Sequence, residues 1–179
     1  MSLSTLSLIL GLVYGTGHLY GFIKPDSFKK GLLNFPRSNP WGYVLMLMAT
    51  LWFLWNVQQE NISDFEPYKP IMVIGFALVG VGSCFFLRDF LSIRALAVLM
   101  LLMAKMMVDT ARWADSPFRL IITTWAYVWV IAGMWLTISP WRMRDMIQWF
   151  TADPTRMRLG CAVRAGFGFL VALLGLFVF

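Results

Sequence analysis

The single histidine of the chain, His18, is the residue with the clearest coordination chemistry. It lies in the apolar stretch GLVYGTGHLYG, on the same helical face as Gly11 and Gly15. An imidazole there can ligate a haem iron or a chlorophyll magnesium, or it can hydrogen-bond to a neighbouring helix. One histidine excludes a haem held by two histidines of this chain. We favour the helix contact, because Gly11 and Gly15 have the GxxxG spacing that lets two helices approach closely.

Three charged residues mark one end of another apolar segment. Lys105, Asp109 and Arg112 fall on one helical face, and Lys105 is one turn from Asp109. A charge deep in a bilayer is costly, so such residues pair with each other or face the interior of a helix bundle. One interpretation is a proton or ion site. The one we favour is a structural ion pair whose side chains extend towards the interface.

A further cation and a pair of tryptophans lie inside other apolar segments. Arg164 has a side chain long enough to reach back to the lipid headgroups. Trp125 and Trp129 share a helical face, where they either flank a pigment, quinone or lipid tail or fill a helix contact, which is the commoner use. Cys84 and Cys161 have no metal-binding spacing, and we expect both to be free thiols.

The motifs of common enzyme families are missing from the sequence. It has no HExxH, no P-loop, no nucleophile elbow and no paired carboxylates. We therefore predict that the protein is not an enzyme. The sequence does not identify a cofactor.

The composition identifies the elements that must position these residues. Hydrophobic residues make up 59% of the 179 and charged residues 13%, where a soluble domain has about 25% charged residues. Runs of about 20 apolar residues cross a bilayer. Six such segments are present, at residues 3–22, 41–57, 70–87, 91–109, 119–138 and 159–179. The runs are continuous rather than alternating, which predicts an all-α polytopic membrane protein with six transmembrane helices.

The basic residues predict how this protein is oriented. Loops one, three and five hold Lys24, Lys29, Lys30, Arg37, Arg88, Arg94, Arg142, Arg144, Arg156 and Arg158. Loops two and four hold only Lys69, Arg112 and Arg119. The positive-inside rule therefore places the first set in the cytoplasm and both termini outside. Trp41 and Trp135 then lie at the cytoplasmic interface, while Trp52, Trp55 and Trp113 lie at the outer one.

Two basic, proline-bounded linkers, residues 21–42 and 137–158, resemble each other. The second repeats apolar residues at Met143, Met146, Ile147 and Phe150, and the first at Phe28, Leu32 and Phe35. Both patterns predict short amphipathic helices in the headgroup plane. The polar faces carry Lys29, Lys30, Arg142 and Arg144. We predict that these contact anionic headgroups or a partner protein; the alternative is that the linkers only turn the chain.

The linkers divide a single membrane domain into three units. Residues 1–57 and 119–179 each form a helix–linker–helix unit, and residues 70–109 form a central hairpin. The two outer units have the same orientation, as in a parallel repeat. In the second linker, Ser139 is expected to cap a helix that has Pro140 in its first turn.

The last unit is similar to a known family. The stretch SPWRMRDMIQWFTADPTRMRLG and the apolar span after it resemble the short two-span bacterial inner-membrane proteins of the YjeT type. The matching residues are Pro140, Arg142, Arg144, Pro154, Arg158 and Gly160. The resemblance covers about the last 45 residues. It implies a bacterial inner-membrane location. It implies no biochemical activity, because none is established for that family.

These observations lead to three expectations of function. The first is a non-catalytic accessory or assembly subunit of a larger membrane complex, with anionic lipid and a protein partner. The second is a small transporter or ion-conducting protein that uses Lys105, Asp109 and Arg112. The third is a haem-, pigment- or quinone-binding subunit that uses His18. The net charge of +6 does not indicate nucleic acid, because a basic nucleic-acid surface needs polar surroundings that this chain lacks.

Overall fold

The computed structural model describes residues 2–60, 63–87 and 89–179, and these residues form helices without a strand. The elements are α1 (Leu3–Ile23), α2 (Pro25–Asn34), η1 (Phe35–Arg37), α3 (Asn39–Gln59), η2 (Ser63–Tyr68), α4 (Lys69–Phe86), α5 (Leu91–Arg112), α6 (Arg119–Ile138), α7 (Trp141–Ala152) and α8 (Pro154–Phe177). Six of them, α1, α3, α4, α5, α6 and α8, are long and apolar enough to cross a membrane. The prediction of an all-α, six-span membrane protein with two short interfacial helices, α2 and α7, is confirmed. Arg88, one of the basic loop residues, lies outside the described ranges.

The boundaries around α7 differ from the expected ones for a local reason. Ser139 closes α6 with a hydrogen bond from its N–H to the carbonyl of Trp135, and it does not cap α7. The last span begins at Pro154, five residues before the predicted start. The Asp153 carboxylate accepts a hydrogen bond of 2.8 Å from the N–H of Thr155, which caps α8 at that point.

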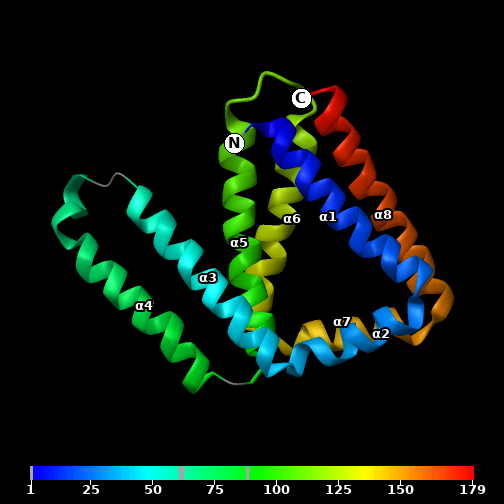
Figure 1. Cartoon of the computed structure of the whole chain (residues 1–179), viewed down its shortest axis with the longest axis horizontal. Helices are drawn as coiled ribbons and strands as arrows, with labels where there is room; N and C mark the ends of the chain where they lie inside the picture. The colour runs from blue at the N-terminus through cyan, green and yellow to red at the C-terminus, as the bar shows by residue number, and fades with distance from the viewer. Residues whose placement is uncertain (1, 61–62, 88) are drawn as a thin grey trace.

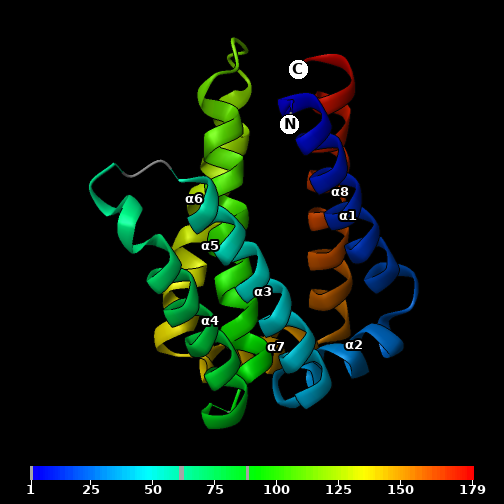
Figure 2. The same ribbon diagram turned by 60° about the vertical axis from the view of Figure 1, so that its left-hand side comes forward.

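The six long helices form two pairs and a hairpin (Figure 1). Helices α1 and α8 run antiparallel to each other, as do α5 and α6, and the two pairs meet near the end that holds both termini. They diverge towards the opposite end, where α2 and α7 lie across the base. Figure 2 shows the hairpin of α3 and α4 beside α5, away from the α1–α8 pair. In this hairpin α3 packs on α5, and α4 packs on α3.

Apolar clusters lie at both ends of the molecule. Where the pairs meet, the buried Trp125 ring on α6 contacts Tyr14 of α1 and Phe167 of α8 edge-on, at centroid distances of 5.2 and 5.1 Å. This geometry is the one that aromatic pairs prefer. Near the base, a second cluster around Ile93 and Leu136 includes partly buried residues of η1 and α7. The base is therefore attached to α5 and α6 by side-chain packing as well as by the chain itself.

Candidate functional site

A seam of glycines joins α1 to α8. A Cβ atom on Gly168 would lie 2.5 Å from the backbone nitrogen of Gly15 and 2.9 Å from the carbonyl oxygen of Gly11. Further along, the Ser4 hydroxyl donates a hydrogen bond of 2.6 Å to the carbonyl of Gly175. Backbones that approach this closely leave no room for a side chain. Gly11 and Gly15 thus lie in the contact between α1 and α8.

His18 lies half-buried on α1, one helical turn after Tyr14, which contacts the Trp125 ring. Its Nδ1 is 2.9 Å from the carbonyl oxygen of Tyr14, which can only accept, so Nδ1 donates this hydrogen bond; in the neutral ring Nε2 then keeps its lone pair. The His18 ring is 4.3 Å from the Tyr14 ring and 6.4 Å from the Phe28 ring, measured between centroids. Within the described ranges there is no group of three His, Cys, Asp or Glu residues that could hold a metal ion.

Lys105 forms the centre of a three-residue ionic group. Its Nζ is 2.7 Å from the Asp109 carboxylate and 3.0 Å from that of Glu60, which ends α3. The three side chains are 45% to 51% exposed, so the group is open rather than enclosed. Arg112 is exposed and lies outside these pairs. The sequence does not indicate Glu60, because an acid at the end of one span does not show which other span it contacts.

Arg164 points from α8 towards the base. Its guanidinium carbon lies 4.7 Å from the centre of the Phe150 ring of α7, a cation–π contact. The Phe150 ring in turn lies against Gly160, where a Cβ would come within 2.5 Å of it. Among the described residues Arg164 has no ion-pair partner. The side chain is exposed and held along an aromatic ring at the level of α7.

The base of the molecule, which we call the interfacial floor, consists of α2, η1 and α7. Lys29 and Lys30 lie on α2 and Arg142 and Arg144 on α7, and of these four only Arg144 forms an ion pair within the described chain. Its Nε and Nη2 donate to one oxygen of Asp145, at 3.0 and 2.9 Å. The four predicted cations therefore lie on two helices of one face of the protein.

The floor also contains a pocket that the sequence did not indicate. A cavity of about 230 Å³ lies between η1 and α7 and is lined by Leu33, Pro36, Arg37, Arg144, Ile147 and Gln148. The two arginines come from different linkers. Their meeting follows from the contact between α2 and α7, which no spacing within either linker reveals.

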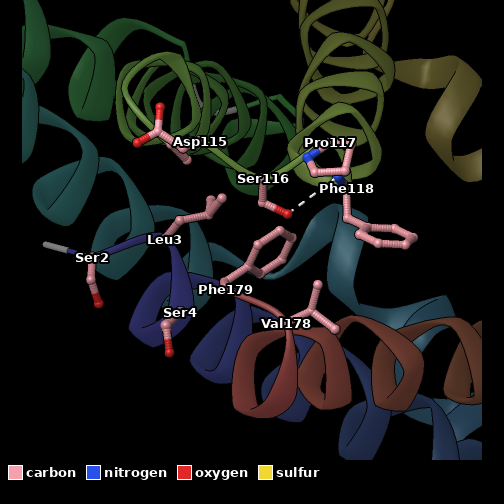
Figure 3. Close-up of a pocket in the computed structure, with 10 residues that line it drawn as sticks. Ser2, Leu3, Ser4, Asp115, Ser116, Pro117, Phe118, Val178 and Phe179 are labelled. Atoms are coloured by element: carbon pink, nitrogen blue, oxygen red, sulfur yellow. Dashed lines mark hydrogen bonds between the residues drawn. The ribbon is translucent and has the colours of Figure 1, made fainter.

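A larger cavity of about 600 Å³ opens at the end that holds the termini. Figure 3 shows the Phe179 ring in its centre, while the side chains of Ser2, Ser4 and Asp115 point away. The Ser116 hydroxyl is used to accept a hydrogen bond from the N–H of Phe118. Because polar groups do not converge on this cavity, it lacks the features of a specific ligand site.

Helix α4 has the most exposed apolar surface of the spans. The described structure buries none of its residues. One face carries five large apolar side chains with exposed fractions of 66% to 88%, Ile71, Leu78, Val79, Phe85 and Phe86. On the same face, a Cβ on Gly75 would meet no atom within 4 Å, and one on Gly82 would meet only a Phe86 ring carbon at 3.9 Å. The opposite face carries Gly80, which packs against Thr50 of α3.

No family model, curated protein or solved structure matches this chain. The six long apolar helices define a multi-pass membrane protein. The resemblance to the YjeT type rests on the residues of the C-terminal unit alone.

Proposed function

We propose that the protein is a non-catalytic accessory subunit of a membrane complex, and that the outer face of α4 docks a transmembrane helix of another subunit. The supporting observation is that α4 has no buried residue among those the structure describes and packs mainly on α3. The molecule holds α4 out at its edge, as Figures 1 and 2 show from two sides.

The shape of this face favours a helix over lipid tails as its neighbour. Lipid tails are as apolar as leucine, so helices associate in a bilayer by close packing at small residues. Gly75 and Gly82 are seven residues apart and make two notches between large side chains. Each glycine costs a helix about 1 kcal/mol relative to alanine. Closer packing with a partner helix would offset that cost, as close packing does at Gly11 and Gly168 inside the protein.

The proposed location is a bacterial inner membrane with the interfacial floor in the cytoplasm. The floor carries five of the loop lysines and arginines, Lys29, Lys30, Arg37, Arg142 and Arg144, and such residues are typically retained on the cytoplasmic side during insertion. The YjeT-type resemblance points to the same membrane. Both termini and the Lys105 group would then face outwards.

Purification from the native membrane in mild detergent tests the proposal. We expect a stable protein partner with the wild type and its loss with the double variant Gly75→Leu, Gly82→Leu. The matched control is Gly17→Leu, Gly166→Leu, because these two glycines on α1 and α8 also face open space. The control should keep the partner. A protein that purifies without a partner, or only with its own copies, would overturn the proposal, as would a partner that both double variants retain.

A further inference from the structure

The pocket of the interfacial floor brings two cations together from separate linkers. Arg37 is exposed and forms no hydrogen bond or ion pair with a described residue. Arg144 uses two of its nitrogens on Asp145 and keeps its remaining donors. The six lining residues include no acid, and Gln148 adds an amide donor. The pocket therefore has an excess of hydrogen-bond donors and positive charge, only partly offset by Asp145 beside it.

The backbone on both sides of this pocket is fixed by contacts deeper in the protein. The buried Ser92 hydroxyl of α5 donates to the carbonyls of Phe35 and Pro36, which hold η1 directly before Arg37. Met143, directly before Arg144, packs into the same apolar cluster as Phe35. The two arginines thus have anchored neighbours, which reduces the entropy lost when they bind one ligand.

The position of Arg144 in α7 also favours an anion. It lies in the first turn of that helix, where the helix dipole is positive and a cation is disfavoured. A bound anion would offset both the arginine charges and the positive helix end. Planar guanidinium groups match the oxygens of a phosphate particularly well.

We propose that this pocket binds the phosphate of an anionic glycerophospholipid. The pocket lies between two amphipathic helices of the kind that lie in the headgroup plane. Its volume of about 230 Å³ is below the range of about 300–1,000 Å³ for drug-sized ligands, so it fits part of a headgroup. Buried Pro36 and Ile147 provide apolar contact beneath the charged groups. The inference is independent of partner docking at α4.

Native mass spectrometry of the delipidated protein in neutral detergent tests this site. The probes are phosphatidylglycerol, phosphatidylcholine and inorganic phosphate. We expect one phosphatidylglycerol to bind more tightly than the rest and more tightly than phosphatidylcholine. Arg37→Gln and Arg144→Gln should each raise its Kd about tenfold or more, because a hydrogen bond to a charged group is lost. Gln148→Leu keeps the net charge and should raise the Kd about threefold.

Two controls separate a built site from general attraction to basic surface. Lys30→Gln and Arg142→Gln remove the same charge from the same two linkers, but neither residue lines the pocket. We expect these variants to change the Kd less than about threefold. Equal losses in control and pocket variants would overturn the proposal, as would equal affinity for both lipids. Displacement of the lipid by millimolar inorganic phosphate would overturn the assignment to a lipid.

Discussion

The hydroxyl of Ser92 donates a hydrogen bond of 2.7 Å to the carbonyl oxygen of Phe35, across 57 residues of chain. The same hydroxyl lies 3.2 Å from the Pro36 carbonyl. Ser92 opens the central span α5, whereas Phe35 belongs to the first linker, so this bond ties two units of the protein together. It holds the interfacial floor against the helices that cross the membrane.

Loss of this bond should destabilise the protein measurably. Ser92→Ala would remove the hydroxyl that donates to the buried Pro36 carbonyl and would leave the Phe35 carbonyl only the N–H of Ser38, which costs about 1–3 kcal/mol. Ser83→Ala is the control, because the Ser83 hydroxyl only bonds back to Val79 within its own helix. Tryptophan fluorescence during denaturation in detergent would follow both. For the control we expect the free energy of unfolding to change by less than about 0.5 kcal/mol. A change as small as this for Ser92→Ala would show that the Ser92 hydrogen bond does not stabilise the protein.

Two glycine-to-alanine substitutions on α8 should differ in their effect on the stability of the protein. Gly168→Ala should destabilise by about 1–3 kcal/mol, because the added methyl would meet the backbone of α1. Gly166→Ala, two residues earlier on α8, meets open space and should be neutral or stabilise by up to about 1 kcal/mol. Thermal unfolding of the two variants in the same detergent makes the comparison. Equal melting temperatures would be incompatible with the α1–α8 contact described here.

The pair of Glu60 and Lys105 should contribute little energy, because both side chains are about half exposed. A double-mutant cycle with Glu60→Gln and Lys105→Gln is expected to give a coupling of about 0.2–1 kcal/mol. The coupling should fall in 1 M salt, where the Debye length shortens to about 3 Å. A coupling above about 2 kcal/mol that resists salt would instead indicate a desolvated pair.

Cysteine labelling tests the orientation. In a variant with Cys84 and Cys161 changed to alanine, a cysteine is placed either at Lys30 or at Asp115. A maleimide that cannot cross membranes should label intact cells at position 115 and react at position 30 only after permeabilisation. These positions lie at opposite ends of the molecule, on the interfacial floor and in the loop after α5. The reverse pattern would invert the proposed topology.

The spans were predictable because a continuous apolar run that crosses a bilayer must form a helix. A membrane-spanning segment must satisfy its own backbone hydrogen bonds, so about 20 apolar residues suffice to identify α1 or α6. The linker helices followed from their amphipathic pattern in the same way. The start of α8 was misplaced because the capping residue Asp153 precedes the apolar run.

Contacts between helices were not predictable to the same degree. Gly11 and Gly15 mark a close contact, but nothing in their spacing identifies Gly168 as the residue opposite them. Glu60 and Arg37 likewise acquire their neighbours only through the arrangement of the helices. Hydropathy also does not separate the surface that faces lipid from the surface that faces another helix, so the exposure of α4 emerged only in the structure.

Photocrosslinking at Val79 tests the central claim of partner docking most directly. Val79 lies between Gly75 and Gly82 on the outer face of α4 and is 66% exposed, while Val163 on α8 is 65% exposed and serves as the control. A photoreactive amino acid at each position would be activated in the native membrane. We expect a protein adduct of defined mass from position 79 and only lipid adducts from position 163. Lipid adducts alone from both positions would contradict docking at α4.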